Sequence, residues 1–178
     1  MQAIAEDAAN KFSIPKELVS AIIGVESSWD TWAFNPEPHY RYMWDVDGRE
    51  AFRELTSSER ASQAPPADFS SPAGVPLDAE WWAQQASWGL MQVMGGTARW
   101  MGMRNPWLTQ LLEPGTGVEY GCRYLRYHLD RSGGDKAAAV AAYNAGSAVL
   151  IPGGNEYKNQ AYVDKVFRLY LSSGADGT

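Results

Sequence analysis

One carboxylate, Glu26, lies where a helical spacing pattern otherwise places apolar side chains. Advancing by about 100° per residue along the helix, Glu26 falls between Ile22 and Val19 in the apolar arc, opposite the polar side chains. A carboxylate in that arc must be paired or must have a raised pKa, because burying an unpaired charge is costly. A raised pKa suits a general acid near neutral pH. The pattern therefore indicates acid/base chemistry, with a structural carboxylate bonded to an arginine or to backbone groups as the alternative.

Four segments of the chain combine polar side chains with glycine or aromatic residues at short spacing. They are Glu26 to Asp30 (ESSWD), Ala86 to Met94 (ASWGLMQVM) with Gly96-Thr97-Ala98, Ala141 to Gly146 (AAYNAG) and Tyr162 to Val166 (YVDKV). In this order they resemble the catalytic domain of soluble lytic transglycosylases, which are lysozyme-like enzymes of glycoside hydrolase family 23 and relatives of goose-type lysozymes. The segments are spread over most of the range from Ile14 to Leu171, so a chance match of all four in this order is hard to credit.

The resemblance implies a role for the polar residues of these segments. Glu26 would be the general acid/base, and Tyr162 would lie close to its carboxylate. Gln92, Met94 and Thr97 would line the glycan groove, Tyr143 and Asn144 would support the site, and Ser27 and Asn35 would also contact the substrate. Amides and hydroxyls can bond the acetamido and hydroxyl groups of sugars, and methionine offers a deformable apolar contact. Taken singly, each side chain also has a structural interpretation, since Gln92 or Asn144 could cap a helix and Tyr143 could be a packed aromatic.

The chain departs from the family pattern in two places. Asn35 stands where the family usually has a serine nine residues after the catalytic glutamate. The family's short link to its Gly-Leu-Met-Gln motif is replaced by the long segment 36–85, which contains Glu37, Trp44, Asp45, Asp47, Trp81 and Trp82. This insertion could reshape the glycan groove or supply a second carboxylate.

The resemblance also implies a reaction. Glu26 would protonate the glycosidic oxygen of the β-1,4 bond between N-acetylmuramic acid and N-acetylglucosamine in peptidoglycan, and the bond would break through an oxocarbenium-like transition state. The ionised carboxylate would then take the proton of the muramyl 6-hydroxyl, which attacks its own anomeric carbon and leaves a 1,6-anhydromuramyl end. The first alternative is a hydrolytic muramidase of the goose type, in which Asp30, Asp45 or Asp47 directs water to the same carbon. The second is a glycan-binding module without turnover, which the position of Glu26 disfavours.

The elements that must position these residues are predicted to be helices. Apolar spacing without a convincing alternating run predicts an all-α, lysozyme-like fold with a long irregular insertion, organised as one domain over residues 1–178. Helices are expected at Pro15 to Trp29, within Glu113 to Arg131, and at Lys136 to Tyr143 and Gln160 to Leu171, with short ones at Arg49 to Leu55, Asp78 to Gln85 and Thr97 to Met101. Irregular structure is expected at 32–44 and 61–76 because prolines interrupt them. Gly89 is expected to permit close packing and Gly146 to end a helix.

The amino-acid composition indicates which kinds of ligand the chain can bind. A formal charge of −6 disfavours binding to phosphate backbones, so no nucleic acid is expected. Eight tryptophans and nine tyrosines offer flat rings that suit sugars, although most such rings pack in cores. No metal and no cofactor are expected, because His39 and His128 are isolated, Cys122 lies on an apolar stripe, and residues 45–48 have only the start of a calcium loop.

The sequence also carries expectations about location. No apolar run is long enough to span a bilayer, and residues 1–10 lack the basic start and apolar centre of a secretory signal. We therefore expect a monomer without stable membrane insertion, made in the cytoplasm and acting on peptidoglycan glycan strands of the cell wall, in the periplasm or outside the cell. A bacteriophage lysin (endolysin) has these features, and so does one domain of a larger bacterial protein.

Overall fold

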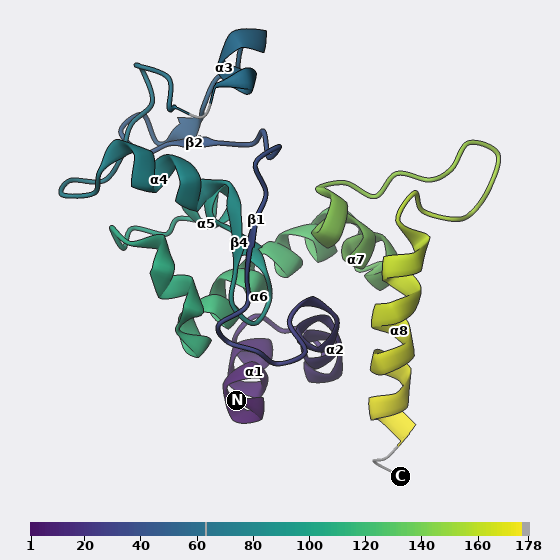
Figure 1. Ribbon diagram of the computed structural model, residues 1–178. Helices are drawn as coiled ribbons and strands as arrows, with labels where there is room; N and C mark the ends of the chain where they lie inside the picture. Colours follow the sequence, from purple (N-terminus) through teal and green to yellow (C-terminus); the bar gives the residue numbers. More distant parts are fainter. Residues whose placement is uncertain (63, 176–178) are drawn as a thin grey trace. The chain divides into compact units, whose positions relative to one another are not determined.

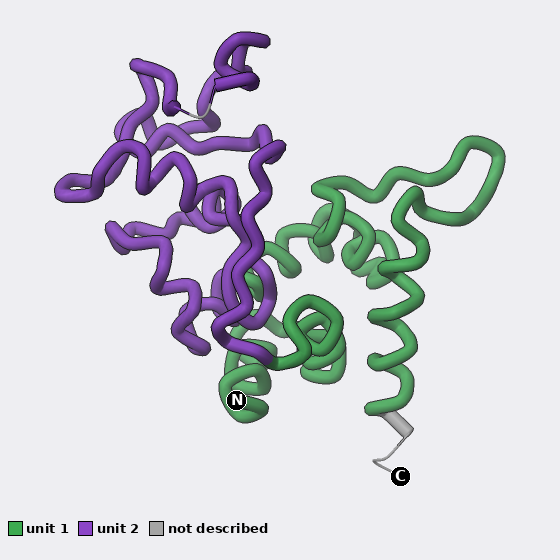
Figure 2. The backbone as a smooth tube through the Cα atoms, in the orientation of Figure 1, with its two compact units in different colours: residues 1–29, 121–178 green, residues 30–120 purple. Residues whose placement is uncertain are grey.

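The structure, a computed structural model, describes residues 1–62 and 64–175 (Figure 1). The chain forms two compact units, which are unit 1 (residues 1–29 and 121–178) and unit 2 (residues 30–120) (Figure 2). Helices dominate and the strands are only two or three residues long, which confirms the predicted helical class. Organisation as one domain stays a prediction. No helix within the described ranges has the length and apolar character needed to cross a membrane.

Unit 1 is helical. It contains α1 (Gln2–Lys11), α2 (Lys16–Glu26), the C-terminal part of α6 (Pro114–Arg131), α7 (Lys136–Ala145) and α8 (Gln160–Ala175). α2 packs against both α1 and α8, and α7 also packs against α8. Leu18, Ile22 and Ile23 of α2 are fully buried, so this helix supplies much of the core of the unit. The three helices predicted between residue 113 and the end of the chain are confirmed, each with a small shift of its bounds.

α2 carries the predicted catalytic residue and ends at it. The prediction that the helix continues to Trp29 is wrong, because Ser28 and Trp29 have φ values of 51° and 68°. These values lie in the left-handed region, which cannot continue a right-handed helix. Glu26 is therefore the last residue of its helix rather than an interior one.

α1 has no counterpart among the predicted helices. Its sequence is dominated by alanine and polar residues, so the spacing of large apolar side chains gives no signal there. Ala5 and Ala9, four residues apart on one face, are its buried residues. Their small side chains leave room for close packing against α2.

Unit 2 combines short helices with two small antiparallel sheets. Its first sheet has the order β1-β4-β5 and its second pairs β2 with β3. The elements in chain order are β1 (Phe34–Pro36), β2 (Trp44–Asp45), β3 (Glu50–Ala51), α3 (Ser57–Ala61), α4 (Leu77–Gln84), β4 (Ala86–Trp88), β5 (Val93–Met94), α5 (Gly95–Trp100) and the 3-10 helix η1 (Leu108–Leu112). The strands were not predicted, because two or three residues are too few for a recognisable alternation.

The insertion, residues 36–85, has a core of its own. Met43, Leu55, Phe69 and Trp81 form a buried cluster, and Phe52 packs against it. The ring of Phe69 contacts that of Phe52 at 5.3 Å and that of Trp81 at 5.0 Å between centroids, both edge to face. The predicted helix at 49–55 is wrong, since the Phe52 amide instead donates to the Met43 carbonyl and extends the pairing of β2 with β3.

Two predicted glycine roles are confirmed. Gly89 has a φ of 67°, and a Cβ atom there would collide with the backbone carbonyl oxygen of Leu111, so β4 and η1 approach each other closely only because Gly89 has no side chain. Gly146 adopts a φ of 77° and ends α7 in the left-handed conformation.

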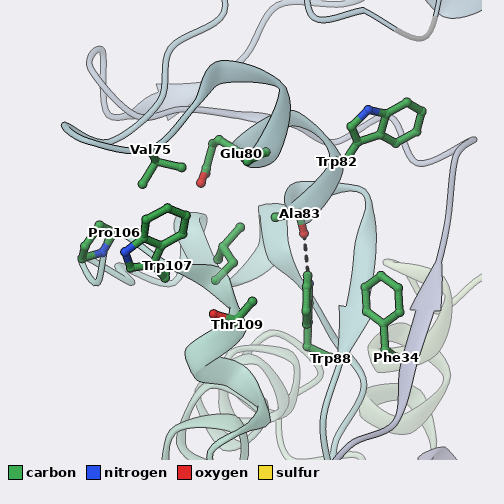
Figure 3. Close-up of a pocket in the computed structure, with 11 residues that line it drawn as sticks. Phe34, Val75, Glu80, Trp82, Ala83, Trp88, Pro106, Trp107 and Thr109 are labelled. Carbon is green, nitrogen blue, oxygen red and sulfur yellow. Dashed lines mark hydrogen bonds between the residues drawn. The ribbon is translucent and has the colours of Figure 1, made fainter.

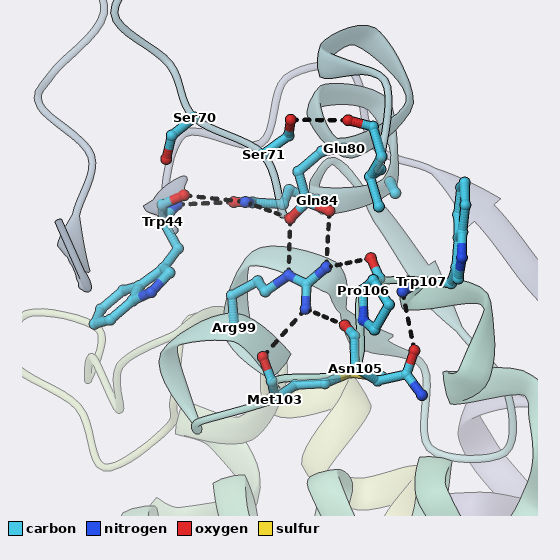
Figure 4. Close-up of polar contacts among 12 residues, drawn as sticks. Trp44, Ser70, Ser71, Glu80, Gln84, Arg99, Met103, Asn105, Pro106 and Trp107 are labelled. Carbon is cyan, nitrogen blue, oxygen red and sulfur yellow. Dashed lines mark hydrogen bonds and ion pairs between the residues drawn. The ribbon is translucent and has the colours of Figure 1, made fainter. Parts of the chain in front are cut away.

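A buried ion pair fastens α4 to α5 in unit 2 (Figure 4). The Arg99 guanidinium donates to both carboxylate oxygens of Glu80 at 2.8 Å, and the two side chains are only 2% and 1% exposed. The other Arg99 N–H groups bond the backbone carbonyls of Met103, Asn105 and Pro106. Every donor therefore has a partner, which is the condition under which a buried pair is tolerated.

Replacing Arg99 is expected to destabilise the protein strongly. The substitution Arg99→Met leaves the Glu80 carboxylate buried without its counter-ion, at a cost of about 3–5 kcal/mol in the free energy of unfolding. Urea unfolding followed by tryptophan fluorescence measures this change. As a matched control, Arg60→Met breaks the exposed ion pair with Glu54 and should cost less than about 1 kcal/mol. Equal effects of the two substitutions would contradict the structural role of Arg99.

Candidate active site

The predicted catalytic carboxylate is held by a tyrosine of another helix. Glu26, at the end of α2, is half-buried, and its Oε1 accepts a hydrogen bond of 2.5 Å from the Tyr162 hydroxyl. Tyr162 lies in the first turn of α8, 136 residues further along the chain. Both residues belong to unit 1, where α2 and α8 pack together along their buried faces. The packing of these two helices therefore brings the pair into contact.

The surroundings of Glu26 bring the pKa of its carboxyl group close to neutral pH. Burial raises the pKa of Glu26 to about 7, against the opposing effect of the Tyr162 hydrogen bond, which lowers it. Burial and the nearby Glu26 charge raise the pKa of Tyr162 above its ordinary value, so this phenol remains a neutral donor. Burial likewise raises the pKa of Tyr143. A carboxyl with such a pKa can both give and take a proton near neutral pH.

The α7 residues predicted to support the site lie in the same unit. Tyr143 is buried, and its ring lies 5.3 Å from that of Tyr124. Asn144 is exposed, and its side-chain oxygen accepts a hydrogen bond of 2.9 Å from Asn159. Asn159 also donates to the Ala141 carbonyl. The two predicted residues are thus placed differently, one in the core and one at the surface.

Asn159 is a residue that the motif comparison missed. Its side chain ties the C-terminal turn of α7 to the start of α8, and its backbone carbonyl accepts a hydrogen bond of 2.9 Å from the Tyr162 amide. It thereby fixes the first turn of α8, from which Tyr162 reaches the carboxylate. An asparagine directly before a predicted helix start is a capping signal that would have drawn attention to it.

Ser27 and Asp30 flank the carboxylate in the sequence but bond locally. The Ser27 hydroxyl donates to the Ile23 carbonyl at 3.2 Å, and this carbonyl also accepts a hydrogen bond from the Ser27 amide. Asp30, one of the candidate acids for a hydrolytic route, accepts a hydrogen bond from the Trp32 amide within its own turn. Asp45 accepts from the Ser70 hydroxyl and the Asp47 amide in unit 2.

The predicted residue Gln92 is fully engaged inside unit 2. Its amide oxygen accepts hydrogen bonds from Asn35 at 2.7 Å and from Ser87 at 2.8 Å. Its amide nitrogen donates to the carbonyls of Ala33 and Gly89. These four bonds use the full capacity of a carboxamide, so Gln92 joins β1, β4 and the turn between β4 and β5. Asn35, which replaces the family serine, takes part in this junction through its own amide.

Met94 and Thr97 are the remaining predicted residues of unit 2. Met94 is the half-buried last residue of β5 and pairs with Ser87 of β4. Thr97 lies in α5 and is only 7% exposed. Its hydroxyl is 3.1 Å from that of Tyr40, a residue of the insertion. The predicted residues therefore form two sets, with Glu26, Ser27, Tyr143, Asn144 and Tyr162 in unit 1 and Asn35, Gln92, Met94 and Thr97 in unit 2.

Unit 2 also contains an aromatic pocket of about 240 Å³ (Figure 3). Side chains alternate along a strand, so Phe34 and Trp88 lie on the sheet face opposite Asn35 and Ser87. Together with Trp82 and Trp107, the two aromatic rings of that face line the pocket. Its carboxylate, Glu80, is committed to Arg99. The pocket therefore lacks a free acid and is separate from the network around Gln92.

The described residues contain no group of three or more His, Cys, Asp or Glu side chains that could hold a metal ion. His128 is instead buried between aromatic rings, with Tyr124 at 4.4 Å and Tyr127 at 5.1 Å between centroids. Burial lowers the pKa of His128 to about 4. Cys122 is buried within α6.

Comparison with known proteins agrees with the motifs. The family model described as "Transglycosylase SLT domain" matches residues 3–164. The chain belongs to this family. A 65-residue segment of this SLT-domain chain is also 43% identical to the soluble lytic murein transglycosylase of Salmonella typhimurium (strain LT2), covering 33% of the chain and 10% of that relative. The matched segment thus spans about a tenth of the length of the relative. No solved structure matches the chain significantly.

Replacing Gln92 tests whether it holds unit 2 together. Gln92→Met keeps the length of the side chain but leaves the four partner groups of the amide without hydrogen bonds, which should lower the free energy of unfolding by about 1–3 kcal/mol. Chemical denaturation measures the change. Gln110→Met, at an exposed position of η1, is the control and should stay within about 0.5 kcal/mol of the wild type. If Gln92 served only to bind glycan, Gln92→Met would change the free energy of unfolding as little as Gln110→Met does. That result would contradict the structural role of Gln92.

Proposed function

We propose that this SLT-domain chain is a lytic transglycosylase that cleaves the β-1,4 bond between N-acetylmuramic acid and N-acetylglucosamine in peptidoglycan. The observation that carries the proposal is the half-buried Glu26, with a pKa of about 7 and a hydrogen bond from Tyr162. Membership of the SLT family and the name of the Salmonella relative supply the substrate class. The non-catalytic alternative is disfavoured, because binding alone gains nothing from a carboxyl with a raised pKa.

In the first step, protonated Glu26 donates its proton to the glycosidic oxygen as the bond to the anomeric carbon breaks. Positive charge develops on the muramyl ring in an oxocarbenium-like transition state. As Glu26 becomes an anion, the Tyr162 hydroxyl continues to donate to it and stabilises the new charge. Tyr162 thus assists the carboxyl without exchanging a proton itself.

In the second step, the Glu26 carboxylate accepts the proton of the muramyl 6-hydroxyl. The oxygen of this hydroxyl attacks the anomeric carbon of the same sugar and closes a 1,6-anhydro ring, which returns Glu26 to its protonated form. Because the nucleophile belongs to the substrate, one carboxyl serves both steps. A hydrolytic muramidase would instead need a second acid to direct water, with Asp30, Asp45 and Asp47 as the candidates.

The local bonding of the candidate acids favours the transglycosylase route. Asp30 is bonded to the Trp32 amide, and Asp45 is bonded to Ser70 and to the Asp47 amide. The carboxylates of Asp30 and Asp45 are thus already engaged in local hydrogen bonds, and the family model that matches the chain is described by its transglycosylase activity. We therefore favour the muramyl 6-hydroxyl over water as the nucleophile.

The proposal includes the setting of the reaction. The chain would act as a monomer on glycan strands of the cell wall, outside the cytoplasm, without binding nucleic acid. It would do so either as a bacteriophage lysin or as the catalytic domain of a larger bacterial wall enzyme.

Removing the acid should abolish turnover. Glu26→Gln cannot donate or accept the catalytic proton, so release of soluble fragments from purified sacculi should fall by about 10²- to 10⁴-fold. Binding of the variant to sacculi should persist. Glu17→Gln, in the first turn of the same helix, is the matched control and should retain wild-type activity. Undiminished lysis by Glu26→Gln would contradict the assignment.

Mass spectrometry of the wild-type products separates the two routes. The transglycosylase predicts muramyl ends that lack one water relative to the reducing sugar, because the internal hydroxyl closes the ring. Reducing muramyl ends would instead identify a hydrolase that uses the same Glu26.

The pH dependence should follow the protonation of Glu26. The first step needs the protonated form, so kcat/KM should decline as the pH rises through about 7. Tyr162→Phe removes a hydrogen bond that lowers the pKa of Glu26, so this decline should move to higher pH and the maximal rate should fall. Initial rates on soluble glycan strands across about pH 5 to about pH 9 measure both effects. A decline that moved to lower pH in Tyr162→Phe would contradict the proposed role of the tyrosine.

A further inference from the structure

The insertion places two tyrosines over the start of α5. The hydroxyl of Tyr40 is 3.1 Å from that of Thr97, and a Cβ atom built on Gly96 would lie 3.0 Å from the Tyr40 ring. The same Cβ atom would lie 2.7 Å from the backbone oxygen of Tyr42. Segment 40–42 therefore lies directly against Gly96 and Thr97, and the absence of a side chain at Gly96 permits this contact.

Two sets of contacts hold segment 40–42 in this position. The Tyr40 ring packs against the core cluster of the insertion, which includes Met43 and Trp81. Two residues beyond Tyr42, the backbone of Trp44 forms two hydrogen bonds with the Gln84 side chain, at 2.8 and 3.0 Å. The Gln84 amide in turn donates to Glu80, the partner of Arg99. Through Trp44, the tyrosine segment is thus tied to the buried polar network of Gln84, Glu80 and Arg99, and Figure 4 shows this network from Trp44 onward.

Thr97 itself is largely covered. It is 7% exposed, and its hydroxyl is already engaged with Tyr40. Tyr42, in contrast, is 77% exposed, and its ring lies edge to face with that of Tyr40 at 5.7 Å between centroids. The side chain that segment 40–42 exposes beside this contact is therefore the ring of Tyr42.

We propose that Tyr40 and Tyr42 form an additional sugar-binding subsite, which the insertion builds over Thr97 and which binds one further saccharide unit of the glycan strand. A tyrosine ring offers a flat face to the C–H groups of a sugar, and its hydroxyl can bond a sugar hydroxyl or acetamido group. Tyr42 is the stacking residue, and Tyr40 positions it through its ring contact and its bond to Thr97. This subsite rests on the proposed function, because it extends the binding of the same glycan.

The experiment compares uncross-linked glycan strands of increasing length as substrates of the full chain. Tyr42→Ala removes an exposed ring with few contacts, so the fold should be kept. It should raise KM for long strands by about two- to tenfold, the range expected for one aromatic contact, and leave kcat unchanged. For the shortest strand that the wild type cleaves, neither constant should change, since that strand does not extend to the additional subsite.

Two further variants sharpen the result. Tyr40→Phe keeps the ring but loses the bond to Thr97, and it should raise KM for long strands by a smaller factor than Tyr42→Ala. Trp107→Ala removes a ring that is 47% exposed elsewhere in unit 2 and should leave KM unchanged at every strand length. It controls for the general effect of removing a surface aromatic side chain.

The possible outcomes separate this proposal from the one on which it rests. An increase in KM that is the same at all lengths, or no increase for Tyr42→Ala, would overturn the subsite and leave the lytic activity standing. If the wild type released no fragments from any strand or from sacculi, the proposed function itself would fail. A length-dependent increase confined to the tyrosine variants supports both.

Discussion

A carboxyl group that donates a proton near neutral pH must be kept partly out of water, and in this chain that constraint falls on the end of α2. Full burial would hold Glu26 permanently neutral, and full exposure would leave it ionised. The half-buried position between these limits depends on two features. The left-handed residues Ser28 and Trp29 end the helix at the carboxyl, and α8 covers it from one side with Tyr162. Asn159 in turn fixes the first turn of α8.

In unit 2, the buried carboxylate is paired with an arginine instead of a tyrosine. Glu80 and Arg99 form a buried ion pair, which is tolerated because the guanidinium donors are all taken up by the carboxylate or by backbone carbonyls. Gln84 extends this network to the backbone of Trp44. This network joins the insertion to α5 through Arg99, and the insertion also has its own aromatic core around Phe69 and Trp81. Side chains presented by that insertion, such as Tyr42, can consequently be held in a defined place.

Much of the fold could be predicted from the spacing of apolar residues. α6, α7 and α8 have either long stripes of large apolar side chains or strong start and stop residues such as Asp135 and Gly146. The predictions failed where such signals are absent. α1 buries only alanines, and the strands of unit 2 are too short to alternate visibly. The helix expected near Phe52 was wrong because its apolar residues serve the core of the insertion, where tertiary packing outweighs local preference.

The sequence by itself determined the family of the chain and the identity of the candidate acid, because both depend on residue types at short range. Glu26 in its apolar arc and the ordered motifs can be read without knowing any contact. The family resemblance also placed Tyr162 near the carboxylate, but only the tertiary structure decided the hydrogen bond between them and the burial that raises the pKa of Glu26. The same holds for Gln92, whose four hydrogen bonds come from groups on both strands and turns. Hydrogen-bond saturation and desolvation are properties of the folded surroundings, and no spacing along the chain encodes them directly.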